Sequence, residues 1–196
     1  MSSEIEALLR AKQFGGPVSP PNVSKAAADA GLLDVAYALE DSPVGRLLLA
    51  VTPRGLVRVS YVDKGHDAVL AELAERISPR ILAAPLDEPR RELEEFFAGR
   101  RQQFSLPIDW RLVGTAFAKQ VLLATSRIPY GGSASYGEVA REAGNPRAHR
   151  ATGTALGRNP LPIVVPCHRV LKADGAIGNY AGGVQRKLTL LAVEQQ

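Results

Sequence analysis

The chain has 196 residues, of which 45% are hydrophobic and 22% are charged, and its net charge is +4. These values are typical of one large or two small folded domains. The single cysteine excludes an internal disulfide, and the three histidines are scattered, so we expect no metal site and no cofactor. No apolar stretch approaches the ~20 residues of a membrane span, and the start lacks a signal-peptide pattern, so we expect a cytoplasmic protein without a membrane partner.

Charge is distributed unevenly along the chain. From Arg111 to the C-terminus there are 11 Lys or Arg residues and 4 Asp or Glu residues. Residues 1–110 hold 13 Lys or Arg residues and 16 Asp or Glu residues. A basic half suggests a polyanionic partner such as nucleic acid. A solvated basic surface explains the charge equally well.

The first half of the chain predicts a small α/β (α+β) domain after a glycine- and proline-rich extension at residues 1–33. Alternating apolar runs predict an antiparallel sheet, and apolar residues at helical spacing predict helices that cover it. The predicted strands are 35–39, 45–51 and 56–62, and the predicted helices are 66–77 and 88–98.

The second half predicts helices separated by sharp turns. A helix over 115–128 is followed by a turn at Pro129–Gly132, and Ser135–Glu138 forms a capping-box pattern that opens the next helix. Gly144 makes a turn, and Asn145–Pro146 is an N-cap with proline in the first position of a further helix, ending near residue 156. Two helices joined by a glycine turn predict a helix-turn-helix, although many helical hairpins with the same pattern of turn residues bind no DNA.

The second helix of this pair is dominated by small residues. Few of its side chains are suited to reading bases in the major groove. A small-residue surface fits the minor groove, which is only about 6 Å wide, while packing against another helix is the alternative.

Cys167 is the first candidate for chemistry, because it lies between Pro166 and the two potential cations His168 and Arg169. Nearby positive charge favours the nucleophilic thiolate, although many single cysteines are small buried hydrophobes. Adjacent side chains of an extended segment point to opposite faces, so His168 would need a water or a third group to reach the thiol. Glu194 is a candidate to orient the imidazole, with a solvated terminal glutamate as the alternative.

These motifs closely resemble those of the O6-alkylguanine-DNA alkyltransferases. The resemblance covers residues 115–194, while the half before it is similar only in pattern. The segments that carry the resemblance are Ile128–Gly131, Ser135–Ala140, Gly157–Pro160, Pro166–Val170 and Gly178–Gly183.

The resemblance implies a ribonuclease H-like domain over 34–109 and a winged-helix-like domain with the helix-turn-helix over 110–196. It implies direct reversal of DNA damage by a methylated-DNA–protein-cysteine S-methyltransferase. An alkyl group would move irreversibly from O6 of guanine in double-stranded DNA to the cysteine, once per molecule. The protein would act as a monomer, with cooperative binding along DNA left open.

The resemblance also assigns roles to residues. Cys167 would accept the alkyl group, and His168 would deprotonate it through a bridging water with Glu194 as support. Asn159 would brace the active-site turn, and Tyr136, helped by Lys187, would donate to the departing guanine. The expected pocket residues are Val170, Tyr180, Ala181, Gly182, Gly183 and Lys187. The expected DNA-binding residues are Arg150, which would fill the gap left by the flipped nucleotide, Tyr136, Arg147, Ala148, Ala151, Thr152 and Gly153.

The chain departs from the family pattern at a few points. It lacks the N-terminal zinc ligands of some relatives, Ala181 replaces a serine found in others, and Leu122 replaces a common tryptophan. Three other functions stay open. They are a protein that binds alkylated DNA without chemistry, a helix-turn-helix regulator and a cysteine hydrolase.

Overall fold

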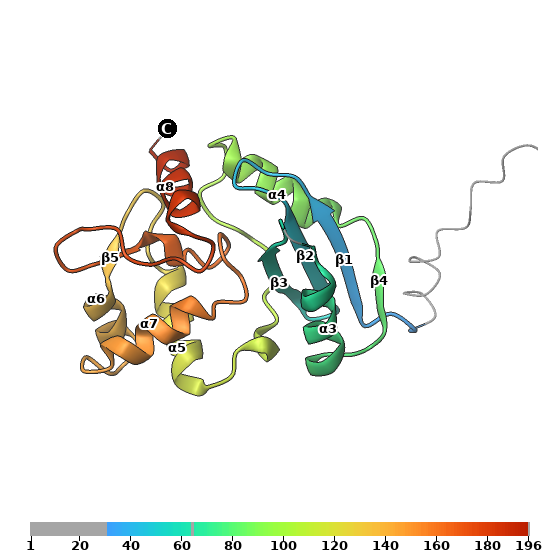
Figure 1. The fold of residues 1–196 in the computed structure, drawn as a ribbon, viewed down its shortest axis with the longest axis horizontal. Helices are drawn as coiled ribbons and strands as arrows, with labels where there is room; N and C mark the ends of the chain where they lie inside the picture. The colour runs from blue at the N-terminus through green and yellow to red at the C-terminus, as the bar shows by residue number, and fades with distance from the viewer. Residues whose placement is uncertain (1–30, 64, 196) are drawn as a thin grey trace, which may run out of the picture.

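The computed structural model describes residues 31–63 and 65–195, and the prediction for residues 1–30 lies outside these ranges. Two lobes lie side by side (Figure 1). The N-terminal lobe contains β1 (Val35–Glu40), β2 (Leu47–Thr52), β3 (Gly55–Tyr61), α3 (Asp67–Arg76), β4 (Ile81–Ala83) and α4 (Asp87–Phe97). The C-terminal lobe contains α5 (Ala116–Ser126), β5 (Ala134–Ser135), α6 (Tyr136–Glu142), α7 (His149–Gly157), β6 (Val170–Leu171) and α8 (Val184–Val193). Among the described helices, none is long and apolar enough to cross a bilayer.

The N-terminal sheet has four strands in the order β3-β2-β1-β4. The predicted antiparallel arrangement of β1, β2 and β3 is confirmed, and the structure adds a fourth strand, β4, which was not predicted and pairs parallel with β1. The strand β4 has only three residues and mostly exposed side chains, so it lacks the alternating pattern that marks a half-buried strand. Its pairing is decided by α3, which returns the chain to the edge beside β1.

The side chains of β2 alternate between two layers of core. Leu47 and Leu49 face the C-terminal lobe, while Leu48 packs with Leu73 of α3 on the other face. A β-bulge shifts the β2–β3 register, so that Leu56 and Val59 both reach the first of these layers. One hydrophobic core therefore runs from the sheet through α4 into the C-terminal lobe.

The helix-turn-helix is present as α6 and α7. Ser135 and Glu138 form the predicted capping box, and Gly144 adopts the left-handed conformation with φ +85°. The predicted start of α7 is wrong, because the helix begins at His149 without a side-chain cap. Instead, Asn145 Oδ1 accepts a hydrogen bond from the Arg147 N–H, a local turn that competes with helix capping.

A backbone contact joins the sheet to the active-site segment. The Val59 N–H of β3 donates to the Pro160 carbonyl at 2.9 Å. Residues 160–170 are buried without interruption. Within them Ile163 has φ 76°, a conformation that is unusual for a β-branched residue. The surrounding core thus holds this segment in one conformation ahead of Cys167.

Candidate active site

Cys167 opens a 3₁₀ turn that spans Cys167–Arg169. The expectation of an extended segment is wrong here, because the Arg169 N–H donates to the Pro166 carbonyl at 2.9 Å and closes the turn. The Cys167 side chain is buried, and its Sγ accepts a hydrogen bond from Asn159 Nδ2 at 3.1 Å. The same Asn159 amide donates to the Val165 carbonyl and accepts from the Leu161 N–H. Asn159 therefore links the thiol to both ends of the preceding loop.

His168, the residue after Cys167, forms a buried pair with Glu194. Their Nε2 and Oε1 atoms lie 2.7 Å apart, and Glu194 caps the C-terminus of α8. Arg169 donates to both carboxylate oxygens at 2.9–3.1 Å and to the Ile128 carbonyl at 2.6 Å. The His168 Nδ1 atom is buried and has no hydrogen-bond partner in the described part of the chain.

The charges of this pair follow from its contacts. Burial alone would raise the pKa of Glu194, but hydrogen bonds from His168 and Arg169 lower that pKa overall, so the carboxylate is ionised. Burial lowers the pKa of His168 in spite of Glu194. A neutral imidazole that donates from Nε2 to the carboxylate leaves Nδ1 as a lone-pair acceptor. The network therefore selects the tautomer that can take a proton at Nδ1.

The surroundings of the Cys167 thiol have opposing effects on its pKa. Burial raises the pKa of Cys167, while the hydrogen bond from Asn159 and the positive charge of Lys187 oppose that rise. Lys187 is fully buried and donates to the Val170 carbonyl, so its ammonium group is held at the backbone three residues after Cys167. The thiol is thus protonated at rest and needs a base to become a strong nucleophile.

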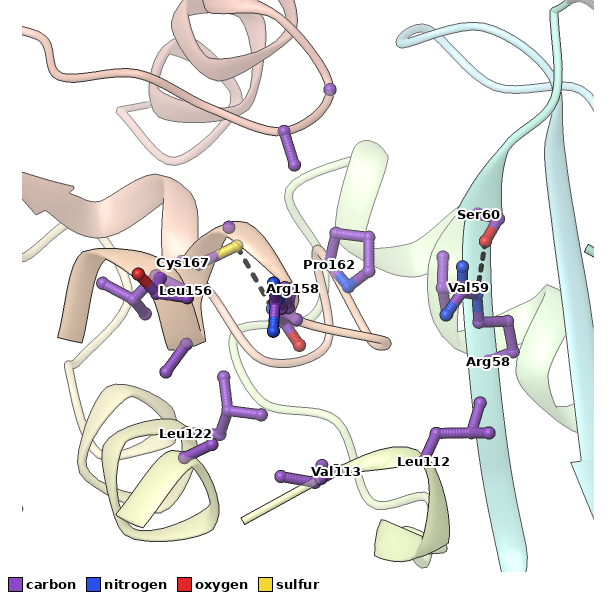
Figure 2. Close-up of a pocket in the computed structure, with 18 of the residues that line it drawn as sticks. Arg58, Val59, Ser60, Leu112, Val113, Leu122, Leu156, Arg158, Pro162 and Cys167 are labelled. Atoms are coloured by element: carbon purple, nitrogen blue, oxygen red, sulfur yellow. Dashed lines mark hydrogen bonds between the residues drawn. The ribbon is translucent and has the colours of Figure 1, made fainter. Parts of the chain in front are cut away.

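Cys167 lies where two cavities meet. The smaller, of about 680 Å³, is shared with Tyr136, Arg150 and the loop residues Asn179–Ala181. The larger, of about 960 Å³, extends between the lobes toward β3, and Figure 2 shows the sulfur on one side of it with Arg58 and Ser60 on the other. Volumes of this size are typical of ligand sites.

The predicted pocket residues differ in their access to these cavities. Tyr180 and Ala181 line both cavities, and Gly182 lines the larger. Gly183, with φ +90°, precedes α8, which carries Lys187. Tyr136 is half-buried at the start of α6, and its hydroxyl lies 3.5 Å from the Asn179 carbonyl. The structure therefore brings the helix-turn-helix and the glycine-rich loop together beside the thiol.

The predicted DNA-binding residues are mostly on the surface of α7 and the turn before it. Arg147, Arg150 and Ala151 are exposed, whereas Ala148 and Gly153 are partly buried. Thr152 is fully buried, so the expectation that its side chain meets DNA is wrong. The helix α7 packs against α5 and α6, so the burial of Thr152 supports the helix-packing alternative for this side chain.

Sequence reasoning missed three residues near the site. The sequence identifies Arg169 only as a cation next to the thiol, and nothing local links it to Glu194, 25 residues away. Tyr61 of β3 contacts Tyr180 across the lobes, and Arg186 of α8 covers the Tyr61 ring. No motif connects these positions, because the contacts depend on how the lobes pack.

Comparison with known proteins places these features in a family. Residues 35–110 match the family model for the ribonuclease-like domain of 6-O-methylguanine DNA methyltransferase, and residues 116–196 match the model for its DNA binding domain. The methylated-DNA–protein-cysteine methyltransferase of Mycolicibacterium paratuberculosis is 40% identical over 162 residues, which cover 83% of this chain and 93% of that protein. The constitutive Bacillus subtilis protein of the same name is 39% identical over 165 residues, covering 81% and 94%.

Solved structures agree with this relationship. Mycobacterium tuberculosis O6-methylguanine methyltransferase superposes with a TM-score of 0.71 at 36% identity, covering 82% of this chain and 93% of the other. OGT of the same organism in complex with DNA superposes with a TM-score of 0.70 at 36% identity, and the match covers 82% of this chain and 92% of the other. Both domain models and the near full-length relatives show that the chain belongs to the 6-O-methylguanine DNA methyltransferase family.

Proposed function

We propose that this protein repairs DNA by direct reversal, moving the alkyl group of O6-alkylguanine to its own cysteine. The observation that carries the proposal is the buried His168–Glu194 pair. The His168 Nδ1 atom has no hydrogen-bond partner among the described residues, and it belongs to the residue next to Cys167. The names of the relatives support methyl transfer, and the DNA complex of Mycobacterium tuberculosis OGT supports DNA as the partner.

Activation of the thiol begins with a proton transfer. A water bridges the Cys167 thiol to His168 Nδ1, which satisfies that buried nitrogen. The proton passes from sulfur through this water to Nδ1. Glu194 stabilises the imidazolium that forms, and Arg169 keeps Glu194 ionised and in place.

Transfer then takes place in a single displacement. The Cys167 thiolate forms a bond to the alkyl carbon as the bond from that carbon to O6 of guanine breaks. The electron pair returns to the base, which receives a proton or hydrogen bond from the Tyr136 hydroxyl, while buried Lys187 stabilises the thiolate. Backbone at Cys167 and Val170 contacts the guanine edge, and the Tyr180–Gly183 loop forms the wall of the pocket. The thioether product is stable, so each molecule acts once.

The C-terminal domain, residues 110–196, both binds DNA and transfers the alkyl group. The protein acts as a monomer in the cytoplasm. A base inside a duplex cannot reach a buried sulfur, so the nucleotide is extruded, which costs a few kcal/mol. Arg150 is exposed at the cavity that contains Cys167, where it fills the gap in the duplex. The small side chains Ala148, Ala151 and Gly153 allow α7 to approach the minor groove without selecting a sequence.

The proposal is tested by measuring the mass of the intact protein after incubation with excess duplex containing O6-methylguanine. We expect one added methyl group, mapped to Cys167, with guanine restored and no second turnover. A protein that binds the duplex and stays unmodified would instead be a lesion-recognition protein. Preferential binding to one promoter without methyl uptake would indicate a helix-turn-helix regulator.

A further inference from the structure

The turn at Pro129–Gly132, between α5 and β5, contacts the end of α8. The Gly132 N–H donates to the Pro129 carbonyl at 3.0 Å and closes the turn. Gly131 has φ +70°, a conformation that favours glycine at the third position of a β-turn. The Gly131 N–H donates to Glu194 Oε2 at 3.2 Å. The turn therefore presents a backbone donor directly to the carboxylate of the buried network.

Tyr130 in this turn anchors the end of α8. The last four carbonyls of an α-helix have no partner within the helix, and helix ends fray unless other groups bind them. The Val193 carbonyl is one of these four, and it accepts a hydrogen bond from the Tyr130 hydroxyl at 3.0 Å. Val193 directly precedes Glu194, so this bond holds the backbone from which the carboxylate extends.

The Tyr130 ring contacts the arginine of the buried network. The Arg169 guanidinium lies 5.8 Å from the ring centroid, within the range of a cation–π contact. The ring of Phe96, which is fully buried on α4, is nearly perpendicular to the Tyr130 ring, with 6.1 Å between the centroids. Tyr130 is thus packed against the N-terminal lobe while its ring contacts Arg169, which donates to the Glu194 carboxylate.

These contacts connect one side chain to two supports of Glu194. Tyr130 binds the backbone beside Glu194 through its hydroxyl, and its ring lies against Arg169. What they constrain is the 2.7 Å separation between His168 Nε2 and Glu194 Oε1. That bond selects the imidazole tautomer that accepts a proton at Nδ1. Tyr130 therefore acts on the imidazole through Glu194.

We propose that Tyr130 is a positioning residue that holds Glu194 against His168. Its hydroxyl keeps the end of α8 from fraying, so the carboxylate stays aligned with the imidazole while the imidazole takes the proton of the thiol. This inference deepens the proposed function, and its consequence for methyl transfer rests on that function. The alignment itself is measured on the protein without DNA.

The test follows the Nε2 proton of His168 by NMR in the full-length protein, labelled with 15N in its three histidines. His168→Gln identifies the resonance by its loss. Exchange of this proton with water requires the imidazole and the carboxylate to separate, so the exchange rate reports local opening of the pair. Urea denaturation of each variant measures the accompanying loss of stability.

Two variants separate positioning from a general structural role. Tyr130→Phe removes the hydroxyl and keeps the ring beside Arg169 and Phe96. Thr125→Val is the matched control, because it removes another hydroxyl-to-carbonyl bond from the same lobe. Thr125 is fully buried, and its Oγ1 donates to the Val121 carbonyl at 2.7 Å. This bond lies within α5 and involves no residue of the buried network.

We expect Tyr130→Phe to speed exchange of the His168 Nε2 proton about threefold to tenfold, as for loss of one hydrogen bond. Single-turnover methyl transfer should slow by a similar factor, while the affinity for duplex DNA stays the same. Thr125→Val should leave both the exchange rate and the transfer rate as in the parent protein, even where it lowers stability.

An unchanged exchange rate in Tyr130→Phe would overturn the inference. Equal speeding by Thr125→Val would also overturn it, since the proton would then exchange through general unfolding rather than through opening at the end of α8. If the parent protein takes up no methyl group from DNA while Tyr130→Phe alone still speeds the exchange, the proposed function fails and the positioning role remains.

Discussion

Two charged networks, one in each lobe, differ in their exposure to solvent. In the N-terminal lobe Arg80 pairs with Asp34 at the surface, where the side chains are 50% and 35% exposed. In the C-terminal lobe His168 and Arg169 pair with Glu194, which is 1% exposed. Surface pairs contribute little to stability, whereas a buried pair is costly to break because the remaining charge has no solvent. The buried network therefore combines a structural role with the control of a proton.

The largest expected effect concerns methyl transfer by the C-terminal lobe. We expect Cys167→Ser to abolish methyl transfer and to retain duplex binding, because the alcohol is a far weaker nucleophile at the same position. Single-turnover methyl uptake and a binding titration check this. Methyl transfer at the parental rate by this variant would show that another atom accepts the group.

Breaking one pair in each lobe tests the contrast directly. Glu194→Gln leaves Arg169 without its buried counter-charge, so we expect the free energy of unfolding to fall by about 3–5 kcal/mol and transfer to slow. Asp34→Asn is the matched control at the surface and should change stability little. Urea denaturation of both variants measures the difference. Equal losses would remove the distinction between the two networks.

The DNA-facing surface should respond to Arg150→Ala in a way that depends on the substrate. If Arg150 fills the gap in the duplex, the variant should lose about 10- to 100-fold in transfer rate on duplex DNA, within the few kcal/mol that extrusion costs. Transfer from free O6-methylguanine should change little. Arg54→Ala, a surface cation of the N-terminal lobe, is the control for lost charge. Equal slowing on both substrates would contradict the role in base extrusion.

Acid should weaken the buried network in two stages. Burial lowers the folded pKa of His168 from 6.5, and hydrogen bonds lower that of Glu194 from 4.5 against the effect of its burial. A lowered folded pKa gives stability that is complete above the unfolded value and is lost as pH falls through the folded value. We therefore expect unfolding free energy to decline below pH 6.5 and further below pH 4.5.

The upper stage can be assigned with single variants. His168→Gln should remove the decline that begins below pH 6.5, whereas His66→Gln and His149→Gln should retain it. Urea titrations at several pH values provide the measurement. A decline that persists in His168→Gln would assign it to other groups.

The smallest expected effect concerns salt. Arg147 is exposed just before α7, and Arg147→Ala should weaken duplex binding about equally for all sequences. The slope of log affinity against log salt should decrease by about one if this residue contacts a phosphate. Arg54→Ala should leave the slope unchanged, and a similar change in both variants would indicate a general charge effect.

Local features of the fold were predictable from the sequence. The capping box at Ser135–Glu138 and the left-handed Gly144 depend on residues within a few positions, so their pattern is visible in the chain itself. Asn145 shows the limit of such reasoning, because its side chain can cap a helix or form a turn, and here it forms the turn. The short strand β4 could not be predicted, since its pairing with β1 joins residues more than forty positions apart.

The sequence by itself determined which groups are present for chemistry: a single cysteine followed by histidine and arginine, a basic second half, and a helix of small residues that also carries arginines. Only the tertiary structure decided how these groups act. It buried Thr152, joined Arg169 to Glu194, and brought Tyr61 to Tyr180. The physical reason is that residue type and helix capping depend on residues that are neighbours in the sequence. Burial, ion pairing and hydroxyl contacts between distant residues arise only when the two lobes pack on one core.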